Sequence, residues 1–205
     1  REARELLRIA LPVPLCPEVF ARVIPEFTYT HANATLNIMQ EGHMAIVTKL
    51  LSHKIDIGIV CKDLTNAMLS YVPYKSVEYC AVFSQDHPLS KCEYITPELL
   101  SKENIYVSGI QNTMTVAIKE YLSGYDNLKI NFVNAYPDSI TALAYDGNGV
   151  VFFPKHASPP NSVPLNPPLC GELVIAWRKE EPLSALQQEF INAMLIERGL
   201  NKLNN

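Results

Sequence analysis

The sequence has little that would mark a membrane-bound, secreted or nucleic-acid-binding protein. No apolar run approaches the ~20 residues that a membrane-spanning helix requires. The stretch Arg1–Arg8 is charged and leads into no long apolar core with a cleavage site, so it is not typical of a signal peptide. The formal net charge is −4, which argues against this chain holding nucleic acid by itself, because phosphate binding needs a positive face. A DNA-binding segment elsewhere in a longer protein stays compatible with that charge.

Cysteine is also used sparingly. The five cysteines are odd in number and include no Cys-x-x-Cys pair, which argues against a disulfide framework and against a zinc site. We expect buried or half-buried reduced thiols and a cytoplasmic location. Three of the histidines lack metal-ligand spacing, so neither a metal nor a cofactor is predicted. The cysteines are Cys16, Cys61, Cys80, Cys92 and Cys170, and the histidines are His31, His53 and His156.

Apolar periodicity predicts alternating strands and helices along the 205 residues. A strand is expected wherever a short apolar or alternating run occurs, and a helix wherever apolar residues recur at three- and four-residue spacing. The predicted strands are 6–11, 35–39, 55–60, 69–74, 77–83, 105–107, 128–133, 150–153 and 173–177. The predicted helices are 17–30, 43–51, 96–100, 113–122, 139–145 and 183–197. Five prolines within 158–168 predict an extended surface loop there.

Strand–helix–strand order with short connections predicts right-handed crossovers and parallel pairing. The order of elements shows two α/β halves, which predicts two Rossmann-like lobes with a hinge between them. We expect residues 1–79 to form the first part of lobe I, residues 80–178 to form lobe II, and residues 179–205 to return to lobe I. A ligand cleft is expected between such lobes, where parallel strands end and helix N-termini point.

The most specific motif is Asp146–Pro154, with sequence Asp-Gly-Asn-Gly-Val-Val-Phe-Phe-Pro. Two glycines spaced by one residue predict a tight turn with positive φ. The apolar run Val150–Phe153 predicts a buried strand, which Pro154 should end. The glycines precede a strand, so they do not form a dinucleotide-binding fingerprint.

Taken together, several motifs make the chain resemble the effector-binding domain of LysR-type transcriptional regulators over essentially its whole length. The order and spacing of the motifs carry the resemblance, because each is weak alone. They are Leu7–Leu11, Phe27 with Thr35–Ile38, Glu41-Gly42, Lys54–Val60, Asp86-His87-Pro88-Leu89 and Gly147–Pro154.

The resemblance implies a type 2 periplasmic-binding-protein-like fold and a small-molecule effector, and implies neither catalysis nor membrane attachment. It makes residues 1–7 the tail of a linker helix. DNA would be contacted only through an N-terminal helix-turn-helix that is absent from this chain. The resemblance also implies a homodimer or homotetramer, with the helices at 17–30 and 113–122 as the expected interface.

The effector is expected between the lobes, where helix N-termini suit a carboxylate, sulfate or phosphate. An apolar first loop and His43, where the family often has Ser or Thr, put the usual hydroxyl contacts in doubt and suggest an organic ligand with some apolar surface. The candidate ligand-binding residues are Pro12, Val13, Pro14, Gly42, His43, Cys61, Lys62, Ser108, Gly109, Thr113 and Ala135.

Several alternatives stay open at this point. His43 is either a donor to an anionic ligand or a water-exposed helix cap, and Lys62 is either a partner for a ligand carboxylate or a solvated lysine. Ser108 and Thr113 flank a polar turn that is either a ligand ledge or ordinary loop chemistry. His87 is interpreted as a turn residue, because no nucleophile has a local signature near it. The alternative function is a periplasmic solute-binding protein of a transporter, and an enzyme is the least favoured hypothesis.

Overall fold

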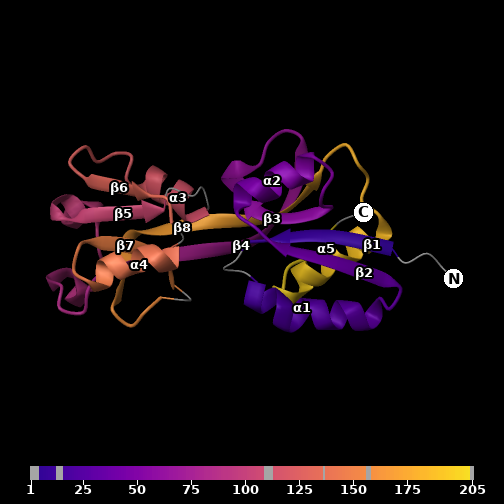
Figure 1. The fold of residues 1–205 in the computed structure, drawn as a ribbon, viewed down its shortest axis with the longest axis horizontal. Coiled ribbons are helices and arrows are strands. Elements are labelled where there is room, and N and C mark those ends of the chain that lie inside the picture. Colours follow the sequence, from indigo (N-terminus) through magenta and orange to yellow (C-terminus); the bar gives the residue numbers. More distant parts are fainter. Residues whose placement is uncertain (1–4, 13–15, 109–112, 136, 156–157, 204–205) are drawn as a thin grey trace. The chain divides into compact units, whose positions relative to one another are not determined.

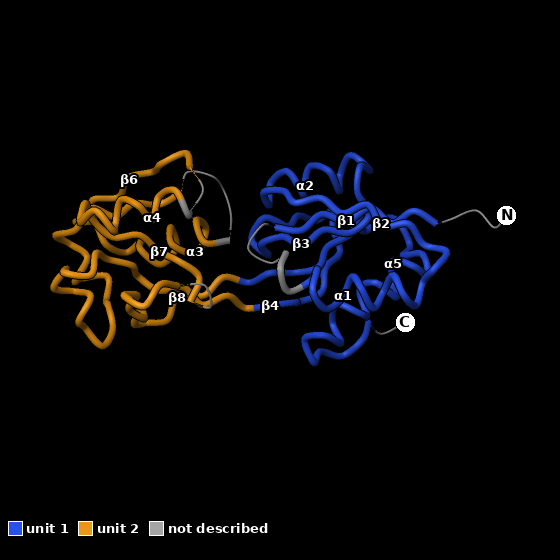
Figure 2. Tube along the Cα trace, turned by 60° about the horizontal axis from the view of Figure 1, so that its bottom comes forward, with its two compact units in different colours: residues 1–75, 172–205 blue, residues 76–171 orange. Residues whose placement is uncertain are grey.

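The computed structural model describes residues 5–12, 16–108, 113–135, 137–155 and 158–203. The chain forms two compact units (Figures 1 and 2). Unit 1 contains residues 1–75 and 172–205, and unit 2 contains residues 76–171. The chain therefore passes from one unit to the other twice, along two long strands, β4 (Leu69–Val82) and β8 (Ser162–Arg178). The sequence-based boundaries at 79 and 178 fall within β4 and at the last residue of β8, in strands whose composition does not mark a border, and they stay predictions.

Unit 1 is built on parallel strands flanked by helices. Strand β1 pairs in parallel with both β2 and β3, and β8 runs antiparallel to β3. The local strand order is β2-β1-β3-β8. The elements are β1 (Glu5–Leu11), α1 (Cys16–Thr30), β2 (Ala34–Gln40), α2 (His43–Leu51), β3 (Ile57–Cys61) and α5 (Ala185–Glu197).

The side chains of β1 divide between the two faces of this sheet. Ala10 joins a buried cluster with Ile46 and Leu50 of α2, so α2 covers one face. The alternating residues Leu7 and Ile9 are buried on the other face, on the side of α1 and α5 (Figure 1). Burial on both faces explains why the sequence of β3 is a continuous apolar run rather than an alternating one.

Unit 2 repeats the parallel pattern with one antiparallel neighbour. Strand β5 pairs in parallel with β6 and β7, and β7 pairs antiparallel with β4. The elements are β5 (Asn104–Ser108), α3 (Thr113–Tyr121), β6 (Lys129–Val133), α4 (Pro137–Tyr145) and β7 (Val150–Pro154), with the short 3-10 turns η3 (Pro88–Lys91) and η4 (Pro97–Lys102). A further 3-10 turn, η2 (Lys62–Leu64), follows β3 in unit 1.

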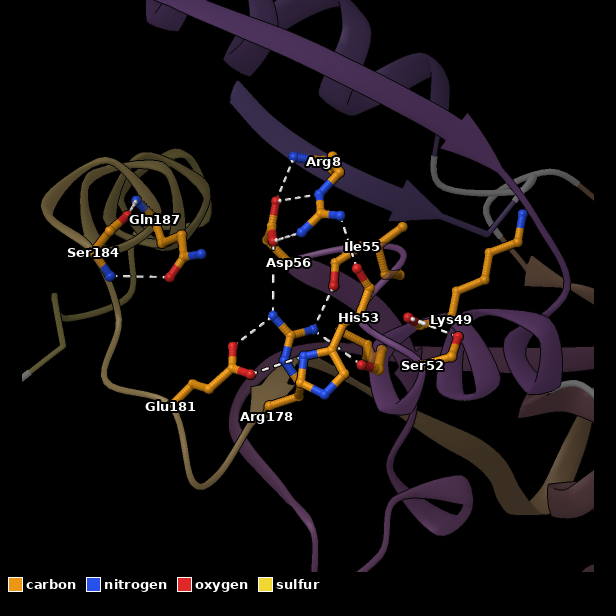
Figure 3. Close-up of polar contacts among 11 residues, drawn as sticks. Arg8, Lys49, Ser52, His53, Ile55, Asp56, Arg178, Glu181, Ser184 and Gln187 are labelled. Carbon is orange, nitrogen blue, oxygen red and sulfur yellow. Dashed lines mark hydrogen bonds and ion pairs between the residues drawn. The ribbon is translucent and has the colours of Figure 1, made fainter. Parts of the chain in front are cut away.

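A charged brace holds the start of β3 to β1 and to the end of β8 (Figure 3). The buried Asp56 carboxylate accepts from the Arg8 backbone N–H at 2.8 Å and from the Arg8 Nη2 at 2.6 Å. The Arg178 Nη1 donates to the carbonyls of Leu50 and Ile55, while its Nη2 lies 2.7 Å from Glu181. The brace joins segments more than a hundred residues apart in sequence.

Three sequence predictions about secondary structure are wrong. Residues 5–7 belong to β1 and not to a linker helix, because they pair in register with Ala34–Leu36. The predicted strands 69–74 and 77–83 form one continuous strand, β4, through Pro73. Much of the predicted loop 158–168 belongs to β8, since backbone groups next to its prolines bond to Ile95: Pro164 supplies a carbonyl and Asn166 an N–H.

The tight turn before β7 is confirmed. Gly147 has φ 75° and Gly149 has φ 153°, and the strand that follows begins at Val150 as predicted. A Cβ on Gly149 would lie 2.1 Å from the Asn104 carbonyl oxygen of β5. The glycine is therefore required by the close approach of two backbones as well as by its φ.

Candidate functional site

In unit 1, the predicted residues gather where β3 ends and α2 begins. Gly42 is the N-cap of α2 and has no side chain with which to cap the first-turn N–H groups. His43 is the first helical residue and is only 5% exposed. Its Nδ1 accepts the backbone N–H of Cys61, the last residue of β3, at 3.0 Å. The water-exposed alternative for His43 is therefore wrong. Its ring joins the start of α2 to the end of β3.

Burial fixes the charge state of His43. Desolvation lowers the pKa of its imidazole to about 4. The ring is neutral near pH 7, and because Nδ1 is an acceptor the proton resides on Nε2. His43 therefore contributes no positive charge to this edge of unit 1 near pH 7.

This burial predicts a loss of stability in mild acid. The unfolded imidazole titrates near 6.5 and the folded one near 4, so the unfolded state binds the proton first as pH falls. The stabilisation is complete above pH 6.5 and is lost progressively toward pH 4. Acidification from pH 7 to pH 5 should lower the free energy of unfolding by about 2 kcal/mol through this residue.

Urea unfolding at a series of pH values measures this effect. The matched variant is His43→Asn, whose side-chain oxygen still accepts a hydrogen bond but does not titrate. The difference between the wild type and this variant isolates His43 from the other histidines. Equal losses of stability in both proteins between pH 7 and pH 5 would contradict the assignment.

Lys62 and Cys61 also lie where β3 ends, but the Lys62 side chain is exposed and the Cys61 side chain is buried. The Lys62 ammonium, on an exposed side chain, lies 2.6 Å from Glu172, and this pairing raises the Lys62 pKa. The exposed side chain agrees with a solvated lysine, and the carboxylate that it meets in this structure belongs to the protein itself. The Cys61 thiol is buried and lies 3.6 Å from Asp63.

In unit 2, two buried hydroxyl groups bond to backbone carbonyls and join the end of β5 to α3 and to the segment that follows β6. The Ser108 hydroxyl donates to the Ala135 carbonyl at 2.8 Å. Thr115, in the first turn of α3, donates to the Ser108 carbonyl at 3.0 Å and is fully buried. Ser108 is itself only 1% exposed, so its hydroxyl serves the framework of this edge. Sequence reasoning identified Ser108 and Ala135 but missed Thr115, whose position in a helical pattern carries no signal.

The remaining predicted residues are placed only in part. Pro12 is buried directly after β1, and Thr113 is the first residue of α3. Val13, Pro14 and Gly109 lie outside the described residues.

Two other reactive side chains, those of His87 and Cys80, make contacts typical of a structural role. His87 is the N-cap of η3, where its Nδ1 accepts the Leu89 N–H, and its ring stacks on Phe83, which agrees with its interpretation as a turn residue. Burial raises the pKa of the Cys80 thiol, which donates to the Phe153 carbonyl. The expectation of buried thiols is wrong for Cys170, which is exposed. Within the ranges that the structure describes, no group of three or more His, Cys, Asp or Glu residues could hold a metal ion.

The fold and its two polar strand edges define a ligand-binding domain of the type 2 periplasmic-binding-protein class. A family model described as the LysR substrate binding domain matches residues 1–197, and the chain belongs to this family. It is a family of regulatory ligand-binding domains and not an enzyme class. No curated protein matches the chain significantly. None of the helices within the described residues is long and apolar enough to cross a membrane.

Solved structures of LysR regulators share the fold at low sequence identity. The effector-binding domain of QuiR in complex with shikimate is 16% identical with a TM-score of 0.83, over 94% of this chain and 96% of that one. A full-length BenM mutant is 20% identical with a TM-score of 0.80, over 100% of this chain and 72% of that one. A full-length OxyR variant from Pseudomonas aeruginosa is 19% identical with a TM-score of 0.74, over 96% of this chain and 70% of that one.

Proposed function

We propose that this domain senses a small anionic effector for a cytoplasmic transcription regulator and passes the signal to an attached helix-turn-helix. The observation that carries the proposal is the distribution of buried polar side chains. Of the five among the described residues, three lie at the carboxyl ends of the parallel strands, namely His43, Ser108 and Thr115. Each of the three is hydrogen-bonded within its own unit, and they hold the chain segments at the strand edges where α/β domains bind ligands.

Each unit offers candidate contacts of its own. In unit 1, the uncapped first turn of α2 at Gly42 offers backbone N–H groups to an anion, and Lys62 can exchange Glu172 for a ligand carboxylate. In unit 2, the hydrogen bonds from Thr115 to Ser108 and from Ser108 to Ala135 position the N-terminal end of α3. The proposed ligand set also keeps Pro12, Val13, Pro14, Gly109 and Thr113. His43 and Cys61 shape the edge in this proposal.

The proposed regulator is a homodimer or homotetramer, paired through α1 and α3. Exposed apolar side chains on and beside these helices support the proposal: Phe20 and Tyr29 on α1, and Phe132 on β6, over which the Lys119 ammonium of α3 lies at 5.0 Å. Effector binding would then act by shifting the population of assemblies that hold the attached DNA-binding helices.

The proposal predicts that the isolated chain binds a small carboxylate with a contribution from Lys62. Calorimetric titration with a panel of hydroxylated and aromatic carboxylates, including shikimate, and with inorganic sulfate should find a binding compound. Lys62→Met should weaken that binding about tenfold, because it removes a charge-assisted contact.

The matched control is Lys155→Met. Lys155 is also exposed and also pairs with a glutamate, Glu78, at 2.7 Å, but it is not among the proposed ligand residues. This control variant should bind as the wild type does. Equal weakening in both variants, or binding that neither variant changes, would contradict the proposed role of Lys62, and chemical turnover of the bound compound would contradict the sensing function.

A further inference from the structure

A surface groove of about 720 Å³ lies in unit 1 where β1 and β2 begin. Its lining comes from Glu5, the first residue of β1, from the segment 30–34 that joins α1 to β2, and from the first two turns of α5. Its size falls within the roughly 300–1,000 Å³ that is usual for ligand pockets. The candidate effector residues Pro12 and Gly42 follow the carboxyl ends of the same strands, so the groove lies at the opposite end of this sheet.

The groove is surrounded by negative charge. The side chains of Glu5 and Glu189 are exposed, and both line the groove. Helix α1 also ends there, at Thr30, and the last carbonyl groups of a helix carry partial negative charge because they have no partners within the helix. The last turn of α1 contains no basic residue, and the lining that the structure describes includes no lysine or arginine. The groove therefore favours a positively charged ligand.

One of the two carboxylates, that of Glu189, already contacts a side chain of the protein. It lies 2.5 Å from the His31 Nε2, which donates to it in the neutral Nε2–H form as well as in the protonated form. The Glu189 side chain is still 56% exposed, so a ligand in the groove can reach it. The contact with His31 therefore positions this carboxylate at the groove without covering it.

The lining also has an apolar part. Ala32, Ala34 and Ala185 contribute methyl groups, and Leu186 contributes a buried side chain. An ammonium group suits carboxylates and helix carbonyls because it has three N–H donors, and a short alkyl chain suits the methyl groups because both lose contact with water on binding. A bare metal cation would leave the apolar part unused, and no group of three or more His, Cys, Asp or Glu residues in the described part of the chain could hold one.

We propose that this groove is a second ligand site, which binds a small organic amine in its alkylammonium form. Glu5, Glu189 and the end of α1 hold the ammonium group. The alkyl chain packs on Ala32, Ala34 and Leu186. All of these groups belong to unit 1, so the site is complete within one unit and does not depend on the proposed function. The bound amine contacts β1, the end of α1 and the start of α5, and it stabilises unit 1 by mass action.

Titration of the full chain with butylamine, followed through backbone amide NMR shifts at about pH 7.5, tests the site. The amine is charged at this pH, as a lysine side chain is. Shifts that saturate should appear at residues 30–34 and 185–189. The same titration with 1-butanol, which keeps the alkyl chain and lacks the charge, should give no saturable shift there. Glu5→Gln and Glu189→Gln should each weaken butylamine binding about fivefold, because each removes one charge and keeps the size of the side chain.

The matched control is Glu26→Gln. Glu26 is an exposed carboxylate on α1 that is not among the residues that line the groove. This variant should bind butylamine as the wild type does, which separates a local site from general attraction to the net charge of −4. Several results would overturn the proposal: shifts that do not saturate, 1-butanol binding equal to that of butylamine, equal weakening in all three variants, or a groove variant that binds as the wild type does.

Discussion

Replacing Asp56 by alanine should lower the free energy of unfolding by about 3–5 kcal/mol, because it removes one partner of a buried charged network. The Asp56 side chain is 7% exposed and accepts from both the backbone and the guanidinium of Arg8. The Arg178 side chain, 11% exposed, lies 3.7 Å away and already has one buried nitrogen, Nε, without a hydrogen bond. In the variant both guanidiniums lose their buried counter-charge.

The matched control for Asp56→Ala is Glu181→Gln, at the rim of the same network. Glu181 pairs with Arg178, which lowers the Glu181 pKa, but its side chain is 45% exposed. Solvent screens this contact, so the variant should keep a stability close to that of the wild type. Urea unfolding of the two variants checks the contrast. If Asp56→Ala hardly changed the free energy of unfolding, the brace would not stabilise the fold as its burial indicates.

The second large effect is expected at Gly149. An alanine there would place its Cβ 2.1 Å from the Asn104 carbonyl oxygen, in a backbone conformation with φ 153° that side chains rarely adopt. Since the obstacle is backbone, no rotamer relieves it, and the start of β7 must move away from β5. Gly149→Ala should therefore cost about 3 kcal/mol of stability.

Gly124→Ala is the control for Gly149→Ala. A Cβ on Gly124 meets no atom within 4 Å, so that variant should stay within about 0.5 kcal/mol of the wild type. Thermal unfolding of both variants measures the difference. Similar melting temperatures for the two variants would mean that the close approach of β5 and β7 is not required for folding.

Local patterns predicted most of the fold. The α2 helix has the bounds 43–51 that its apolar spacing indicated, and the Gly-Asn-Gly turn leads into β7 as expected. Predictions failed where distant residues decide the outcome. Pro164 is typical of a loop, but it lies in β8, where its carbonyl and the N–H of Asn166 bond to Ile95, and a proline ring blocks neither of these groups.

The candidate sites show the same limit. The sequence placed His43 and Ser108 at strand edges, and both lie there. Their burial and partners depend on residues far along the chain, as with the Ser108 hydroxyl and Ala135. The contact between His31 and Glu189 joins positions 158 residues apart, and no periodicity or motif connects them. Sequence patterns report which face a residue occupies, and tertiary packing decides which group it meets.

The central claim is that this chain is the sensing part of a transcription regulator. Reading the native gene upstream of the Arg1 codon tests that claim most directly. The account predicts an open reading frame that continues upstream into a helix-turn-helix segment joined to β1. A secretory signal peptide immediately before Arg1 would contradict it, because the same fold would then belong to an exported solute receptor with no attached DNA-binding segment.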